Sequence, residues 1–143
     1  MAEKVILATV SDDRYGRKGG KYSQTQDFIL NLFLQNSQFG IRDFSFWKWE
    51  DILKTTFYKD NKKLLDSPDP AINGRCYKPF IICEALNAAN EGDYVIYNDV
   101  SPEWWIDKKI DYNLYNLDVI KQMCTYNGGI LSSAALWVCN NKW

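Results

Sequence analysis

The sequence predicts an α/β domain, with an open, mostly parallel β-sheet and helices on both faces. The run Lys4–Val10 is apolar without polar alternation, as in strands that are buried on both faces. A second strand, Ile41–Trp47, follows a helical segment, and a third, Asp93–Asn98, follows another helix. This succession predicts a βαβ unit with a parallel strand pair and a right-handed crossover. The 143 residues suit a single domain, residues 1–143.

The first helix is expected between the first two strands. Ser23 and Gln26 match a capping box, which would open the helix. Its apolar face is expected to carry Phe28, Ile29, Leu32 and Phe33. The helix is expected to end near Phe39, where Gly40 can serve as the C-cap.

The middle of the chain is expected to be helical with one interruption. The segment Trp49–Leu65 has helical character in part, and Ser67–Pro70 then breaks the chain. Pro79 suits the first turn of a helix, so the next helix is expected from Pro79 to about Asn90. Gly92 would stop it before the third strand.

The last part of the chain is expected to add one helix and one strand. Asn116 would cap a helix that runs through Tyr126, and Ile130–Cys139 would form a further strand. Between the third strand and this helix lies the pair Trp104 and Trp105. These rings could stack on a base or a sugar, or they could belong to the core or to an interface.

The composition restricts the chemistry. Lys and Arg number 17 and Asp and Glu 18, so the formal net charge is −1, which argues against nucleic acid as a partner. There is no His, which excludes Ser-His-Asp and Cys-His catalysis and His-ligated zinc. The four Cys form no CxxC pair and predict reduced thiols in a cytoplasmic protein. No apolar run is long enough to predict a signal peptide or a transmembrane segment.

Polar residues follow the first and third predicted strands. The first strand ends in Thr9–Asp12 and the third in Asn98–Ser101. Ligands of parallel α/β sheets bind beyond the carboxyl ends of the strands, so both segments are expected at one ligand-binding edge. With no His available, the Asp99 carboxylate suits a hard cation such as Mg²⁺ or Mn²⁺, which also takes oxygens from substrate phosphates. The alternative for Asp99 is an Asx-turn after the strand.

Two basic segments are candidates for anion binding. Arg75 and Lys78 lie just before or at the expected start of the Pro79 helix, where two cations could share one anion. The alternative is a solvated loop with Lys78 merely exposed. The loop Arg14–Lys21 is basic and Gly-rich, but it matches neither GxxxxGK[ST] nor GxGxxG. It is expected to be either a solvated loop or a flap over phosphates.

The stretch CYKPFIICEALNAANEGDYVIYNDVS, residues 76–101, resembles the centre of GT-A type glycosyltransferases, in particular their small bacterial and viral members. Lys78-Pro79 matches the lysine–proline pair of that family, Gly92-Asp93 matches its turn, and Asp99 matches the first Asp of its DxD-type motif. The segments FYKDNKKLLDSPD and CTYNGGILSS also resemble their counterparts. The similarity therefore covers most of the chain.

The resemblance implies a Rossmann-like, GT-A nucleotide-sugar-binding half. It implies binding of a nucleotide-diphospho-sugar, most readily a UDP-sugar, and transfer of the sugar to a hydroxyl of a glycan or another acceptor. The donor-site residues that it implies are Thr9, Ser11, Asp12, Arg75, Lys78, Asn98 and Asp99. Asp99 would hold Mn²⁺ or Mg²⁺ together with Ser101, which stands at the second acidic position of the motif. Such domains continue beyond the point where this sequence stops, so a domain that is incomplete at its C-terminus is expected.

Two other classes of function remain open. One is a non-catalytic module that binds a nucleotide sugar and transfers nothing. The other is an interaction protein whose aromatic side chains lie at a partner surface. The residues considered for that surface are Trp104, Trp105, Trp137 and Trp143.

Overall fold

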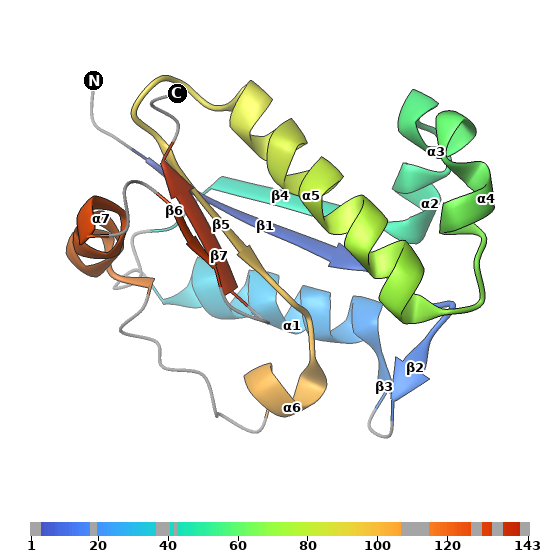
Figure 1. Ribbon diagram of the computed structural model, residues 1–143. Helices are drawn as coiled ribbons and strands as arrows, with labels where there is room; N and C mark the ends of the chain where they lie inside the picture. The colour runs from blue at the N-terminus through green and yellow to red at the C-terminus, as the bar shows by residue number, and fades with distance from the viewer. Residues whose placement is uncertain are drawn as a thin grey trace.

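A mixed β-sheet forms the centre of the structure, a computed structural model that describes residues 4–17, 20–36, 41, 43–106, 115–126, 130–132 and 136–140. The described strands of this sheet are ordered β4-β1-β5-β7-β6 (Figure 1). Strand β1 (Val5–Ser11) pairs in parallel with β4 (Asp43–Lys48) on one side and with β5 (Tyr94–Asn98) on the other. These three strands confirm the parallel part of the predicted sheet.

The other two strands of this sheet run antiparallel to their neighbours. Strand β7 (Leu136–Asn140) pairs with β5, and β6 (Ile130–Ser132) pairs with β7. The prediction of one strand over Ile130–Cys139 was wrong, because Ser132 lies opposite Trp137 and this pairing requires a chain reversal between them. The run is longer than most strands, a length that already favours two strands over one.

Helices pack on both faces of the sheet (Figure 1). The helices on one face are α1 (Tyr22–Gln35), α6 (Pro102–Trp105) and α7 (Leu117–Tyr126). The helices on the other face are α2 (Trp49–Ile52), α3 (Thr56–Asp60), α4 (Lys62–Leu65) and α5 (Pro70–Ala88). This arrangement confirms the predicted α/β class.

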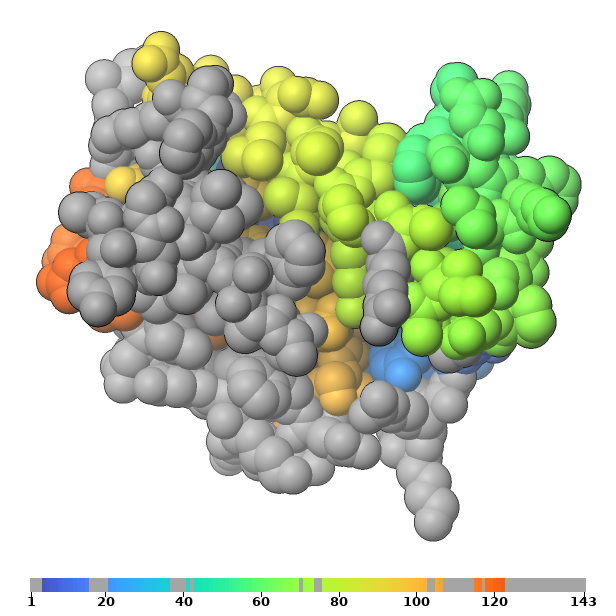
Figure 2. Space-filling view, in the orientation of Figure 1, coloured from blue at the N-terminus to red at the C-terminus, as the bar shows by residue number. Residues whose placement is uncertain are grey.

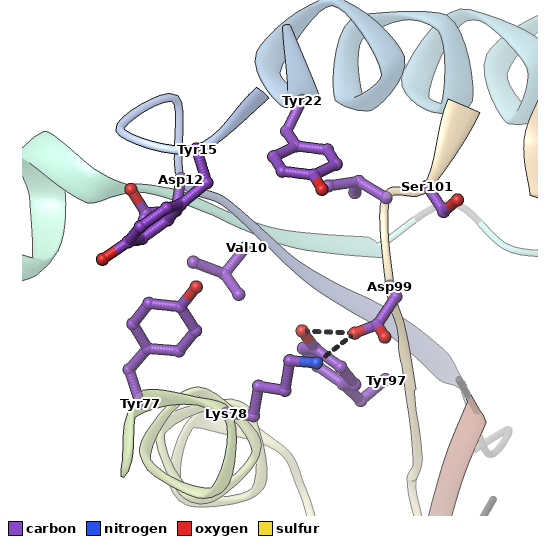
Figure 3. A pocket seen from close by; sticks show the side chains of 10 residues that line it. Val10, Asp12, Tyr15, Tyr22, Tyr77, Lys78, Tyr97, Asp99 and Ser101 are labelled. Atoms are coloured by element: carbon purple, nitrogen blue, oxygen red, sulfur yellow. Dashed lines mark hydrogen bonds and ion pairs between the residues drawn. The ribbon is translucent and has the colours of Figure 1, made fainter. Parts of the chain in front are cut away.

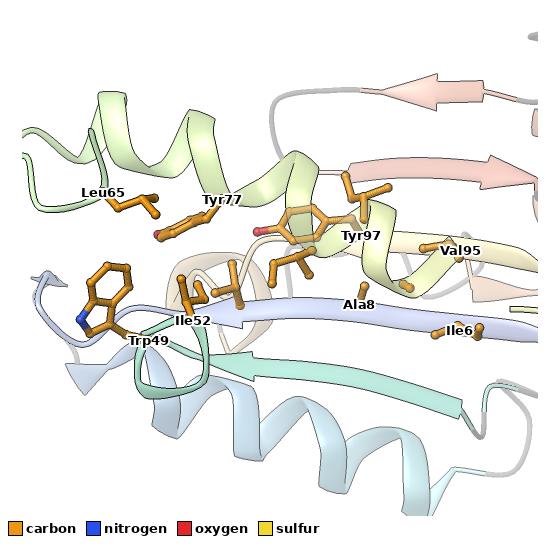
Figure 4. Close-up of a cluster of buried hydrophobic side chains, with 12 residues drawn as sticks. Ile6, Ala8, Trp49, Ile52, Leu65, Tyr77, Val95 and Tyr97 are labelled. Atoms are coloured by element: carbon orange, nitrogen blue, oxygen red, sulfur yellow. The ribbon is translucent and has the colours of Figure 1, made fainter. Parts of the chain in front are cut away.

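Alternate residues of β1 enter different cores because successive side chains of a strand point to opposite faces. Val5 and Leu7 pack with buried side chains of α1, whereas Ile6 and Ala8 pack with buried side chains of α5 (Figure 4). All residues of β1 are buried, as the unbroken apolar run predicts. The same alternation decides which polar side chains at the strand ends share a site.

Helix α1 begins and ends differently from the prediction. Its N-cap is Lys21, whose backbone N–H donates to the Gln24 side chain at 3.2 Å, so the expected capping box of Ser23 and Gln26 was wrong. The side chain and N–H of Ser23 instead donate to Asp13. The helix ends at Gln35, and residues 37–40, where its end was expected, lie outside the described residues.

The buried face of α1 is narrower than predicted. Ile29 and Phe33 are fully buried and Leu32 packs against the same core. Phe28 is 39% exposed, so its expected place on this face was wrong.

Helix α5 begins nine residues before the predicted start at Pro79, which is about two and a half helical turns. Asp69 is its N-cap and accepts a hydrogen bond from the Ala71 N–H at 2.9 Å, and Pro70 occupies the first helical position. The prediction that Pro79 opens this helix was wrong, because Pro79 lies in its interior. Asp followed by Pro is a sufficient start signal, since proline lacks a donor that the first turn does not use.

The segment between β4 and α5 folds into three short helices, α2, α3 and α4, which confirms its predicted partial helicity. In Figure 2 the green surface of α3 and α4 adjoins the yellow-green surface of α5. The glycine-rich segment after β1 forms a small antiparallel pair, β2 (Gly16–Arg17) with β3 (Gly20–Lys21). Its role as a flap stays a prediction.

Two smaller expectations concern Cys residues and membrane spans. Cys76 and Cys83 are free thiols, and Cys83 is exposed, while the side chains of Cys124 and Cys139 lie outside the description. Over the described part of the chain, no helix combines the length and apolar character that crossing a membrane requires.

The side chain of Asn116 accepts a hydrogen bond from the N–H of Asp118 at 2.9 Å, which confirms that Asn116 caps helix α7 as expected.

Candidate functional site

A pocket of ≈ 190 Å³ lies at the carboxyl ends of β1 and β5 (Figure 3). The residues that line it are Val10, Asp12, Tyr15, Tyr22, Tyr77, Lys78, Tyr97, Asp99, Val100 and Ser101. This is the edge of the sheet at which the sequence predicts a ligand site. The volume is below the roughly 300–1,000 Å³ of most small-molecule sites. The pocket can therefore enclose one group of sugar-ring or diphosphate size and leave the rest of a larger ligand outside.

The pocket lies on the α5 side of the sheet. Strand alternation places Val10 and Asp12, from β1 and the residue after it, on the same side as Tyr97 and Asp99, from β5 and the residue after it. Helix α5 supplies the opposite wall with Tyr77 and Lys78. In Figure 3 the Lys78 side chain reaches from α5 to the end of β5.

Asp99 forms an ion pair inside this pocket. Its Oδ1 lies 2.8 Å from Nζ of Lys78 and accepts a hydrogen bond from the hydroxyl of Tyr97 at 3.2 Å. The Asp99 backbone carbonyl accepts from the indole N–H of Trp105 at 2.7 Å, which fixes the chain just after β5. The carboxylate thus engages side chains across the pocket, unlike the Asx-turn considered as its alternative role.

Asp12, the second carboxylate of the pocket, is held by Arg14. It is only 4% exposed, and Nη2 and Nε of Arg14 lie 2.8 Å from Oδ2 and 3.0 Å from Oδ1. Partial burial acts to lower the pKa of Arg14, but the hydrogen bonds and charge of Asp12 outweigh it and raise that pKa. The guanidinium also donates to the Leu65 carbonyl at 2.8 Å and stacks 3.3 Å from the ring centroid of Trp49. Arg14 therefore neutralises Asp12 and ties the pocket to α2 and α4.

Tyrosine side chains supply most of the remaining pocket wall. Burial, assisted by the negative charge of Asp12, raises the pKa of Tyr77 above its ordinary value. Burial, assisted by the charge of Asp99, likewise raises the pKa of Tyr97. Both hydroxyls therefore stay protonated at neutral pH and can donate hydrogen bonds.

Three predicted donor-site residues lie on the opposite face of the sheet. The Ser11 hydroxyl donates to Oε1 of Gln26 at 3.1 Å, and Nε2 of Gln26 donates to the Thr9 hydroxyl at 2.9 Å. Asn98 accepts a hydrogen bond from the Tyr115 hydroxyl. Thr9, Ser11 and Asn98 are all buried and do not line this pocket. These contacts separate the three side chains from Asp12 and Asp99, because adjacent strand residues point to opposite faces, and their roles in donor binding stay predictions.

Of the two basic residues predicted to bind an anion, Arg75 and Lys78, the structure describes the side chain of Lys78 alone. Lys78 lines the pocket, whereas the side chain of Arg75 lies outside the description. Both residues are interior to α5, so the argument that they sit at a positive helix end was wrong. The alternative of a solvated loop is also wrong, because Lys78 is helical and ion-paired.

The tryptophan residues do not form the expected surface where they are described. Trp105 is fully buried and packs edge-on against Phe33, with ring centroids 6.0 Å apart, which confirms the core alternative for this residue and contradicts its roles in ligand stacking and in a partner surface. The side chains of Trp104 and Trp137, and all of Trp143, lie outside the description.

A divalent cation held by Asp99 and Ser101 does not fit these contacts. Oδ1 of Asp99 is already engaged by Lys78 and Tyr97, and the Ser101 hydroxyl points away from Asp99 in Figure 3. The described residues contain no group of three His, Cys, Asp or Glu side chains that could hold a metal. A metal ion at this position would have to displace the ammonium group of Lys78 from the carboxylate of Asp99.

Tyr15, Tyr22, Tyr77 and Tyr97 are pocket residues that the sequence reasoning missed. A signal was present for two of them. Tyr97 precedes Asp99 by two residues and therefore shares its face of the strand, and Tyr77 adjoins Lys78.

Comparisons with protein-family models, with curated proteins and with solved structures found no match to this chain.

Proposed function

We propose that this chain binds a nucleotide-diphospho-sugar in the strand-end pocket and acts as a GT-A type glycosyltransferase or as its donor-binding half. One observation supports this most directly. Lys78 and Asp99 match two separate parts of the GT-A sequence pattern, the lysine–proline pair and the DxD-type motif. Nζ of Lys78 lies 2.8 Å from Oδ1 of Asp99 in one pocket. Three parallel strands with helices on both faces are compatible with the Rossmann-like sheet of such a domain.

The pocket offers suitable chemistry for the diphospho-sugar part of the ligand. The Lys78 ammonium has three donors, and one of them can contact Asp99 while the others reach ligand oxygens. The rings of Tyr77 and Tyr97 offer flat faces for a sugar or a base. A fixed cation near the leaving phosphate would stabilise its developing charge, and the pocket wall would position the sugar for an acceptor hydroxyl.

The donor proposal is tested by calorimetric titration of the protein with UDP-glucose and related UDP-sugars. Lys78→Met is expected to weaken binding by about tenfold or more, because it removes the one cationic group among the described side chains that line the pocket. Lys63→Met is the matched control, since Lys63 is exposed on α4 and does not line the pocket. If no nucleotide sugar binds, or if both variants bind like the parent, the proposal fails.

A non-catalytic binding module is the second candidate. The observation that favours it is that both carboxylates of the pocket, Asp12 and Asp99, are paired with cations, so neither is a free general base. An assay for release of UDP from UDP-glucose, with and without glycan acceptors, separates the two. Binding without turnover would support the module, and acceptor-dependent release would support the transferase.

A further inference from the structure

We propose that the pocket carries its own cation: the Lys78 ammonium occupies the place beside Asp99 that a divalent metal would take, and ligand binding is metal-independent. This inference rests on the proposed nucleotide-sugar site and specifies its electrostatics. It departs from the expectation of Mn²⁺ or Mg²⁺ drawn from the sequence.

The contacts of Asp99 support this assignment. Nζ of Lys78 and the hydroxyl of Tyr97 both meet Oδ1, at 2.8 Å and 3.2 Å. The side chains of Lys78 and Asp99 are 32% and 30% exposed, so the pair is partly removed from solvent screening. A metal ion on this carboxylate would lie beside the ammonium group, and the two like charges would repel each other.

The position of Lys78 is fixed by the fold. It lies in α5 between Tyr77, which is 7% exposed, and the buried residues Ile81 and Ile82 of the same helix. These neighbours pack against β1 and β5, so the backbone from which the lysine extends cannot move away without opening the core. In Figure 3 the extended Lys78 side chain spans the pocket and meets Asp99.

Among the described residues of the pocket wall, no second carboxylate is available to coordinate a metal ion. Asp12 is the other acidic lining residue, and both of its oxygens lie within hydrogen-bonding distance of Arg14. Ser101, the neutral residue of the expected metal pair, has its hydroxyl turned away from Asp99. Asp99 is thus a positioning residue, which orients the ammonium of Lys78 towards the ligand.

The first arm of the test measures metal binding alone, by the electron paramagnetic resonance signal of free Mn²⁺ during titration with the protein. No binding that depends on Asp99 is expected. Binding tighter than about 1 mM that is lost in Asp99→Asn would overturn the inference. This arm needs no nucleotide sugar, so it decides the inference even if the proposed donor site fails.

The second arm measures UDP-glucose binding by calorimetry, once with EDTA and once with Mn²⁺. Affinities within about twofold of each other are expected, with Lys78→Met weaker by about tenfold in both buffers and Lys63→Met unchanged. Binding that requires Mn²⁺ would overturn the inference and leave the proposed function standing. Absence of binding in both buffers would instead refute the proposed function.

Discussion

Replacing Arg14 by Met is expected to destabilise the fold severely, although Arg14 does not line the pocket. The change leaves the Asp12 carboxylate, which is 4% exposed, without its counter-ion. Removal of one partner from a buried ion pair costs about 3–5 kcal/mol. The hydrogen bond to Leu65 and the stacking on Trp49 are lost as well. We therefore expect a loss of about 4 kcal/mol in the free energy of unfolding.

Urea unfolding followed by tryptophan fluorescence measures this loss. Small domains are stable by about 5–15 kcal/mol, so the variant should remain folded but close to its limit. With an m value of about 2 kcal/mol per M urea, the midpoint is expected to fall by about 2 M.

Two further variants separate the buried pair from a general charge effect. The double variant Asp12→Asn with Arg14→Met is expected to recover part of the lost stability, because no buried charge is then left unpaired. Lys62→Met, which removes an exposed ion pair with Asp66, is expected to change the midpoint far less. A midpoint shift for Arg14→Met as small as that of Lys62→Met would refute the reasoning.

Three other perturbations give independent tests. Pro79→Ala restores an N–H in the interior of α5 and is expected to raise the free energy of unfolding by up to about 3 kcal/mol, or about 3 °C in Tm for each kcal/mol. Asp13→Ala is expected to cost stability at neutral pH. Partial burial acts to raise the pKa of Asp13, but hydrogen bonds from Ser23 and nearby lysine charge lower it below 3.8. Its contribution is therefore present above the unfolded pKa and is lost as the pH falls through the lower folded pKa. Gln26→Leu leaves buried polar groups on the α1 side of the sheet without hydrogen-bond partners. It is expected to lower the free energy of unfolding by about 2–3 kcal/mol without changing the affinity for UDP-glucose.

Each of these tests has a control and a contrary outcome. Pro70→Ala, at the first position of α5, is the control for Pro79→Ala, and equal effects of the two would contradict the interior-proline argument. For Asp13→Ala, a stability difference from the parent that persists unchanged as the pH falls through the folded pKa of Asp13 would show that its charge is not responsible. A loss of UDP-glucose affinity in Gln26→Leu would mean that the two faces of the sheet are coupled.

The parallel part of the fold could be predicted because the responsible signals are local. Lys4–Val10 and Asp93–Asn98 are short apolar runs, and both form strands close to the expected bounds, β1 and β5. Helix α5 was placed wrongly because two prolines compete as its start. Asp69 before Pro70 supplies a capping side chain that Pro79 does not have, and the fold then tolerates Pro79 in the interior because the flanking turns are packed in the core.

The candidate site could be predicted as a location but only in part as a set of side chains. Asp12, Lys78, Asp99 and Ser101 line the pocket, and their roles in binding a donor or a metal stay predictions. Thr9, Ser11 and Asn98 do not, because proximity in sequence was treated as proximity in space and the two-residue period of a strand separates neighbours. The ion pair of Lys78 with Asp99 could not be derived from the sequence, since it depends on how α5 packs over β5.

The alternation along β1 and β5 also has a consequence for protein engineering. Most of the pocket wall consists of residues that face α5, whereas Thr9 and Ser11 hold the sheet to α1 through Gln26. A combinatorial library confined to Val10, Tyr77 and Tyr97 would therefore explore ligand preference while leaving the α1 layer intact. The fold thus provides a scaffold on which recognition can be varied separately from the framework that supports it.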